Sequence, residues 1–252
     1  MFQVLLKKEI LEAGRTSRLL VTLVVFFVVG LISPILAKYT PLILRSIPDL
    51  PAGLANVIPE PTVRDAIVQY VKNISQFGIL LVILFGMGSV AQEKERGTAA
   101  MLLTKPVRRS QVILAKWLAA ILIMLGGLAA SAVACLVYTG ILFQWLPFQA
   151  YLILNGFMAV FLGVYLTVSI LASSLARSQS MAAAGAFGGL VILLVFSSIP
   201  RLSNYLPGQL INWGSELMFG GGKAAWGALA VSLGLIIVML LLAALHFERE
   251  EI

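Results

Sequence analysis

Charge is scarce in this chain of 252 residues: only 12% are Asp, Glu, Lys or Arg, whereas 60% are hydrophobic. Soluble domains carry about 25% charged residues, and no soluble core of this size could bury so much apolar surface. The composition therefore excludes a soluble protein and predicts one whose solvent is lipid. Lys and Arg outnumber Asp and Glu by 18 to 11, an excess that in a membrane protein indicates topology before it indicates nucleic-acid binding.

Cysteine and histidine each occur once, which excludes several kinds of site. Cys135 lies inside an apolar run, so the chain has no disulfide framework and no cysteine pair for a metal. We predict no metal site. His246 ends the last apolar run and is expected to be an interfacial residue, which also argues against an intramembrane serine protease.

The sequence contains no GxxxxGK[ST] phosphate-binding loop. The segment Gly220–Lys223 resembles one only superficially, because Ala224 follows it. No acidic or basic residue lies in the middle of an apolar run, which excludes the intramembrane ion pairs of ion-driven transporters. The chain is therefore not expected to be an enzyme, and any uphill transport must draw its energy from another polypeptide.

Six apolar runs are long enough to cross a bilayer as helices, so the predicted fold is an all-α membrane protein with one transmembrane domain, 1–252. The spans are predicted at 19–37, 74–91, 117–142, 150–174, 181–199 and 224–247. Prolines in the outer segment 38–73 argue against a long regular element at its start. Thr62 and Asp65 form a capping-box pattern, from which a helix should lead into the second span. A second outer loop is expected between the last two spans.

Residues 1–18 are predicted to form a helix in the membrane interface. Phe2, Leu6 and Ile10 share one face at helical spacing, but Glu9 lies close to that face and interrupts the apolar stripe. A basic topology anchor with no other role is the equal alternative. Twelve of the 18 Lys and Arg residues fall on the side of the termini, which predicts that both termini and the segment 92–116 are cytoplasmic.

The densest charged stretch lies between the second and third spans. Residues 91–116 hold six of the 18 Lys and Arg residues and two of the 11 acids, around an apolar group formed by Met101, Leu102 and Leu103. Charged flanks around an apolar group are typical of a docking surface for a soluble partner. A basic loop held on anionic lipid is the alternative interpretation.

Local signals divide this stretch into short elements. The helix of the second span is predicted to continue to Arg96, where Gly97 can adopt the left-handed conformation that ends a helix. A short helix across the ends of the two spans should then run from Thr98 to Lys105, before Pro106. Ser110 is the expected N-cap of the third span.

The order of residues in this segment is Gln92-Glu93-Lys94-Glu95-Arg96-Gly97-Thr98, then Leu102-Leu103, Lys105-Pro106-Val107-Arg108-Arg109 and Lys116. This order resembles the membrane subunit of an ABC-2 type transporter. In that family the segment between the second and third spans follows the pattern Glu-x-x-x-Gly-Thr, an apolar pair, Pro and a basic cluster. The layout of six spans matches over the whole chain, and the residue pattern matches over 92–116.

The resemblance implies an export permease that works with a separate cytosolic ABC ATPase. Two ATPase subunits would serve two membrane subunits, either a homodimer or a pair of close paralogues, in the cell membrane of a prokaryote. This chain would need no cofactor, because ATP and Mg would be bound by the ATPase. The residues expected to couple to it are Glu93, Glu95, Arg96, Gly97, Thr98, Met101, Leu102, Leu103, Lys105, Pro106, Arg108 and Arg109.

Two further groups of residues are functional candidates. Gly185 and Gly189 form a GxxxG pattern that permits close helix approach, either within the subunit or at the dimer interface that the resemblance favours for this span. Polar residues that could line a translocation path are Asn73, Ser75, Gln76, Asn155 and Ser169. Each of these could instead simply bond a neighbouring carbonyl. A six-span scaffold or channel without transport remains the alternative to a permease.

Overall fold

The computed structural model describes residues 2–46, 59–97 and 108–249, and within these ranges the chain forms helices and no strands. In chain order the helices are α1 (Phe2–Arg15), α2 (Arg18–Arg45), α4 (Val63–Met87), α5 (Ala91–Glu95), α7 (Arg109–Leu142), α8 (Phe148–Leu175), α9 (Gln179–Ser197), α10 (Pro200–Ser203), α11 (Gly208–Leu217) and α12 (Trp226–Arg249). Six of these helical segments are long and apolar enough to cross a membrane, which confirms the predicted fold class.

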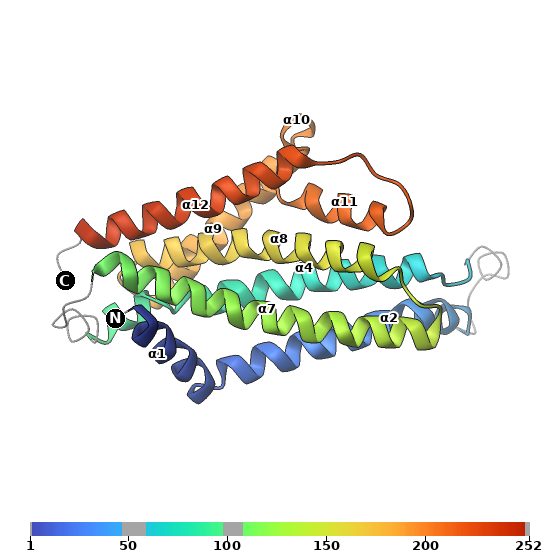
Figure 1. The fold of residues 1–252 in the computed structure, drawn as a ribbon, viewed down its shortest axis with the longest axis horizontal. Coiled ribbons are helices and arrows are strands. Elements are labelled where there is room, and N and C mark those ends of the chain that lie inside the picture. Colours follow the sequence, from blue (N-terminus) through green and yellow to red (C-terminus); the bar gives the residue numbers. More distant parts are fainter. Residues whose placement is uncertain (1, 47–58, 98–107, 250–252) are drawn as a thin grey trace.

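The long helices lie side by side along the long axis of the molecule (Figure 1). Helix α1 and the last turns of α12 lie at the same end, which we call the terminal end (Figure 1). The opposite end, where α2 finishes and α4 begins, is the distal end. An even number of crossings brings the chain back to the end from which it started.

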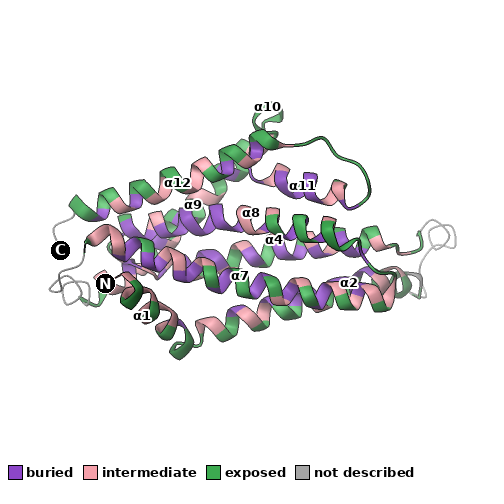
Figure 2. Cartoon of the chain, viewed as in Figure 1, coloured by how far each residue is buried: buried purple, intermediate pink, exposed green. Residues whose placement is uncertain are grey.

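Helix α8 forms the centre of the bundle and packs against α4, α9, α11 and α12. In its most apolar window 72% of the residues are buried, against 17% for α9 and 22% for α12 (Figure 2). Leu154, Leu162 and Ile170 are fully covered. A helix that is hydrophobic all round belongs in a core, and α8 occupies that position here.

Helices α2, α4 and α7 form the second half of the bundle, where small residues permit close contact. A Cβ atom on Gly30 of α2 would collide with the backbone of Ser131 on α7. A Cβ atom on Gly127 of α7 would lie 2.9 Å from the Phe26 ring of α2. The glycines are therefore required by the packing of α2 on α7.

The start of the outer segment differs from the prediction. Helix α2 continues through Pro34 and Pro41 to Arg45, whereas the prolines had argued against a regular element beyond residue 37. The extension packs along α7, and the amine of Lys38 donates to the carbonyl of Leu142 at 2.8 Å. Neighbouring helices compensate for prolines within membrane helices, and proline spacing alone does not reveal such contacts.

The start of α4 confirms the capping box. The Thr62 N–H donates to Asp65 Oδ2 at 2.8 Å, and the Asp65 N–H donates to Thr62 Oγ1 at 3.4 Å. The predicted cap of the third span was wrong, because α7 begins at Arg109 after an extended Arg108 and not after Ser110. Both outcomes concern a single helical turn, where a side chain caps the helix only if the backbone of the preceding residue has the required conformation.

The predicted outer loop between the last two spans contains two helices, α10 and α11. Leu210 of α11 is fully buried, and Trp213 stacks on Phe157 of α8 with ring centroids 4.6 Å apart. The glycines and Pro207 of this region are typical of a loop, but they lie at the ends of α11 or do not interrupt it. Burial of the apolar face against α8 stabilises this ten-residue helix.

Candidate functional site

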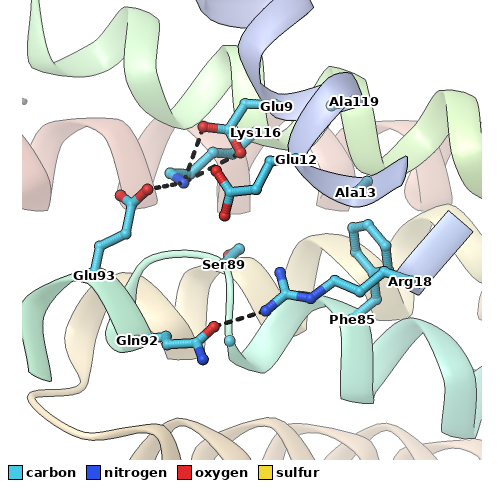
Figure 3. Close-up of a pocket in the computed structure, with 11 residues that line it drawn as sticks. Glu9, Glu12, Ala13, Arg18, Phe85, Ser89, Gln92, Glu93, Lys116 and Ala119 are labelled. Atoms are coloured by element: carbon cyan, nitrogen blue, oxygen red, sulfur yellow. Dashed lines mark hydrogen bonds and ion pairs between the residues drawn. The ribbon is translucent and has the colours of Figure 1, made fainter. Parts of the chain in front are cut away.

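Helices α1, α5 and α7 meet at the terminal end around the side chain of Lys116 (Figure 3). Its amine donates to Glu93 Oε1 of α5 at 2.8 Å and to Glu9 Oε1 and Oε2 of α1 at 3.1 and 3.3 Å. The exposed fraction of the side chain is 4% for Lys116, 14% for Glu9 and 19% for Glu93. We call these three residues the ionic cluster.

Lys8 lies at the rim of the ionic cluster. Its amine is 3.0 Å from Glu9, 3.1 Å from Glu12 and 3.2 Å from Glu93. Burial alone would lower the pKa of this amine, but the charges of Glu9 and Glu93 and the hydrogen bonds to Glu9 and Glu12 outweigh burial and hold the pKa above its usual range. Lys8 therefore stays protonated at neutral pH and links α1 to α5 a second time.

The three carboxylates of Glu9, Glu12 and Glu93 lie close enough together to suggest a metal site, with oxygens within 4.8 Å of one another. Carboxylates are the ligands that Ca²⁺ and Mg²⁺ prefer. Here the amines of Lys8 and Lys116 lie among the carboxylates and bond to them. The geometry fits carboxylates paired with the two lysines better than a site built for a metal.

A cavity of about 30 Å³ lies beside the ionic cluster (Figure 3). On its far side Arg18 Nη2 donates to Gln92 Oε1 at 2.7 Å, and the Arg18 guanidinium lies 6.0 Å from the centre of the Phe85 ring. A space of this volume holds a water molecule but no solute. The terminal end thus has the character of a junction between helices and not of a substrate pocket.

The helix is interrupted between α4 and α5, and Ser173 of α8 forms hydrogen bonds with the backbone groups that this break leaves unpaired. Its hydroxyl accepts from the N–H groups of Val90 at 3.0 Å and Ala91 at 2.9 Å, and it donates to the carbonyl of Met87 at 2.8 Å. These are groups that a helix end leaves unpaired. The prediction of one continuous helix to Arg96 was wrong, because α4 ends at Met87 and α5 begins at Ala91. The local sequence does not reveal this break, since the residue that stabilises it is more than 80 positions away.

The opposite side of α5 is attached to the other half of the bundle. The Lys94 amine donates to the carbonyl of Ser174 at 2.6 Å and lies 5.6 Å from the centre of the Phe247 ring of α12. Glu95 Oε2 accepts from the N–H of Gln179 at 3.0 Å, where a carboxylate favours the start of α9. Helix α5 therefore connects the ionic cluster on one side to α8, α9 and α12 on the other.

Several predicted coupling residues can be placed around α5. Glu93 was expected at the charged rim of a docking surface, but its side chain points inward into the ionic cluster. Arg96 and Arg108 are exposed, and Gly97 has a φ of 69°, the left-handed conformation predicted for it. The short predicted helix and the candidates Thr98, Met101, Leu102, Leu103, Lys105 and Pro106 lie outside the described residues.

The candidate path residues divide into bonded and exposed ones. Asn155 accepts from the Tyr70 hydroxyl at 2.7 Å, Asn73 donates to Ser33 at 2.9 Å, and Ser169 donates to the carbonyl of Ile83 at 2.9 Å. These three are buried and each bonds a neighbouring helix, Ser169 through a carbonyl and the two asparagines through side chains. Their role in a translocation path stays a prediction. On α4, Ser75 is half-buried and Gln76 is exposed.

Gly185 and Gly189 lie along the contact between α9 and α8. A Cβ atom on Gly185 would be 3.2 Å from the Cβ of Ala172, and one on Gly189 would be 2.5 Å from the side chain of Val168. The glycines therefore permit close packing within the subunit. Their contribution to a dimer interface stays a prediction.

Sequence reasoning missed the ionic cluster as a unit. Glu9 was noted only as an interruption of an apolar stripe, and Lys116 only as the last residue of the charged segment between the second and third spans. Two opposite charges at otherwise apolar positions were the available signal, because such charges are rarely buried unless they are paired. The separation of 107 residues between the two positions concealed the pairing.

Comparison with known proteins gives two matches over nearly the whole chain. A family model described as ABC-2 family transporter protein matches residues 3–252. An uncharacterized transmembrane protein of Bacillus subtilis (strain 168), YxlG, is 26% identical over 250 residues, which cover 98% of this chain and 97% of the relative.

Proposed function

Because this chain belongs to the ABC-2 family of transporter proteins, we propose that it is the permease subunit of an exporter driven by a separate ABC ATPase. Six candidate spans and the lack of a phosphate-binding loop in the sequence support this division of labour. Two copies of the chain, or this chain and a close paralogue, would pair with two ATPase subunits that bind ATP and Mg. The terminal end would face the cytoplasm of a prokaryotic cell, as the positive-inside rule requires.

The proposed docking surface for the ATPase is the segment 92–116. Leu102 and Leu103 would supply most of the affinity, since a fully buried leucine side chain contributes about 1.5–3 kcal/mol. The exposed Arg96 and Arg108 would form rim pairs worth about 0–1 kcal/mol each, which set register more than affinity.

The single observation that carries the proposal is the position of α5. This helix lies at the start of the docking segment and is bonded on one side to Lys116 of α7 and on the other to Ser173 and Ser174 of α8. A displacement of the docking segment would therefore be transmitted to both halves of the bundle. Glu93 acts in this scheme as an internal link and not as a contact to the ATPase.

The test is co-purification of the tagged chain with a partner that contains a GxxxxGK[ST] loop. The complex should hydrolyse ATP, and the isolated chain should not. The double variant Leu102→Ser/Leu103→Ser should lose the partner and the ATPase activity while remaining in the membrane. The matched control is Val4→Ser/Leu11→Ser, which changes two exposed apolar residues of α1 at the same end and should keep the partner.

Retention of the ATPase by the Leu102→Ser/Leu103→Ser variant would contradict the docking role and favour a loop held on anionic lipid. Purification without any phosphate-loop partner, together with unchanged solute flux when ATPase genes are absent, would favour the six-span scaffold or channel. These two outcomes are distinguishable, because only the first leaves ATP-driven transport intact.

A further inference from the structure

An open apolar groove of about 660 Å³ lies between α9 and α12, with α8 as its floor. Helix α8 packs extensively on both neighbours, whereas the described parts of α9 and α12 make few contacts with each other. Ala172 lies on the floor, Gly188 and Ile192 on the α9 wall, and Leu235 and Met239 on the α12 wall. The groove belongs to the two spans that the rest of the described chain buries least.

The two ends of the groove differ. At the end of the groove near α10, Phe196 and Leu206 line it. Toward the terminal end the α12 wall ends at Met239, whereas α8 and α9 continue to line the groove as far as Ala176 and Met181. The groove therefore opens on its α12 side toward the terminal end, beside the turn that joins α8 to α9.

The shape of the groove favours a hydrocarbon chain over a helix. Its lining on α9 runs from Met181 to Phe196, which at 1.5 Å per residue is about 22 Å. A helix of that length, about 10 Å across, would occupy roughly 1,700 Å³, more than the about 1350 Å³ of empty space in the groove and its opening. A narrow apolar groove left unfilled loses dispersion contacts on its walls, and a flexible chain restores them.

A cation lies at the open end. Arg177 is exposed and occupies the turn between α8 and α9, directly after Ala176 of the groove lining. Basic residues between membrane helices at the level of the headgroups bind anionic lipid. We propose that the groove binds one acyl chain of an anionic phospholipid from the leaflet at the terminal end, with the headgroup phosphate at Arg177.

Gly188 allows the groove to be filled without disturbing the bundle, because a Cβ atom there would meet nothing within 4 Å. The control is Gly234 on α12, which is equally unobstructed but does not line the groove. The full chain is purified in detergent with phosphatidylglycerol, and retained lipid is counted by native mass spectrometry. We expect Gly188→Phe to retain one phosphatidylglycerol fewer per chain than the unchanged protein, and Gly234→Phe to retain the same number.

The headgroup contact is tested by competition between phosphatidylglycerol and phosphatidylcholine. Arg177→Gln should abolish the preference of the groove lipid for phosphatidylglycerol. Arg201→Gln, which removes an exposed cation at the opposite end, should leave the preference unchanged. Should Gly188→Phe fail to fold, the smaller Gly188→Leu replaces it in both measurements.

Equal lipid counts in the unchanged protein and Gly188→Phe would overturn the proposal. So would a loss of dimer in Gly188→Phe with the lipid count unchanged, because that result would assign the groove to a second copy of the chain. Neither outcome depends on ATPase binding, so the lipid site and the permease function are tested separately.

Discussion

Lys116 is a buried cation shared by two carboxylates on two different helices. Its amine lies within 3.1 Å of both Glu9 and Glu93, and its side chain is almost fully covered. Burial of such charges costs desolvation energy that only good pairing offsets. Removal of one partner is therefore strongly destabilising, whereas removal of all the charges together is often close to neutral.

We predict that Lys116→Met lowers the free energy of unfolding by about 3 kcal/mol, because the carboxylates of Glu9 and Glu93 then keep Lys8 at the rim but lose their buried cation. Thermal unfolding of the purified chain, followed by intrinsic fluorescence, measures the loss. The conservative variant Lys116→Arg should cost less, since it keeps the charge. The triple variant Glu9→Gln/Glu93→Gln/Lys116→Met should recover most of the loss, and a triple variant as unstable as the single one would show that packing, not charge, stabilises the site.

The ionic cluster also shows what a single sequence can reveal about a site. Its members lie 23 and 107 residues apart, so no local pattern connects them. The sequence did show that both charges occupy unfavourable positions, because Glu9 interrupts an apolar face and Lys116 directly precedes a long uncharged run. The sequence could therefore indicate that each charge needs a partner of opposite sign, but not that Glu9 and Lys116 pair with each other.

Gly97 supports a second prediction at the residue scale. Its φ of 69° is unfavourable for residues with a Cβ atom, although a Cβ there would meet no neighbour within 4 Å. Gly97→Val should therefore impose a backbone cost of about 1–2 kcal/mol and shift the direction in which the chain leaves α5. Partner binding and ATP-driven transport measure the effect. Gly97→Asn should be milder, because asparagine tolerates this conformation, and equal impairment by both variants would place the effect outside the backbone.

Among the elements, the break between α4 and α5 depends on one hydroxyl from another helix. The Ser173 hydroxyl bonds three backbone groups there, whereas the hydroxyl of the adjacent Ser174 donates to the carbonyl of Leu171 in its own helix. Ser173→Ala should leave the N–H groups of Val90 and Ala91 unsatisfied, at a cost of about 1–3 kcal/mol. Faster amide hydrogen exchange at residues 90–95 is the expected sign.

Ser174→Ala is the matched control for that measurement, because it removes a hydroxyl one position along the same helix without touching the break. Exchange at 90–95 should then stay as in the unchanged protein. If both variants behave alike, the break does not depend on Ser173.

The elements themselves were predictable to the extent that their causes are local. The capping box of Thr62 and Asp65 lies within four residues, and the pattern found it. The extension of α2 past Pro41 and the folding of α11 depend on contacts with α7 and α8, which the local sequence does not contain. Hydrophobic length predicted the six crossings, because the bilayer imposes the same minimum on each span regardless of its partners.

For the whole molecule, the fold brings α1, α5 and the last turns of α12 to one end (Figure 1). In the sequence, 12 of the 18 Lys and Arg residues fall in the segments on the side of the termini. Cations are retained on the cytoplasmic side during insertion, so the asymmetry predicts that the terminal end is cytoplasmic. The proposed ATPase contact requires the same orientation, because ATP is available only there.

Single cysteines test this orientation. Cys135 is fully buried and its sulfur lies 3.7 Å from the hydroxyl of Thr139, a contact that serine can keep, so Cys135→Ser provides a background with little change. On that background Glu60→Cys, exposed at the distal end, should react with an impermeant maleimide on intact cells.

Gly14→Cys, exposed on α1, should react only after the cells are permeabilised. Both positions are exposed in the structure and lie outside the six candidate spans, so a difference between them reports the side of the membrane and not burial within the protein. The reverse pattern would place the ionic cluster and the segment 92–116 outside the cell. A cytosolic ATPase could then not reach its proposed docking surface, and the permease function would fail together with the topology.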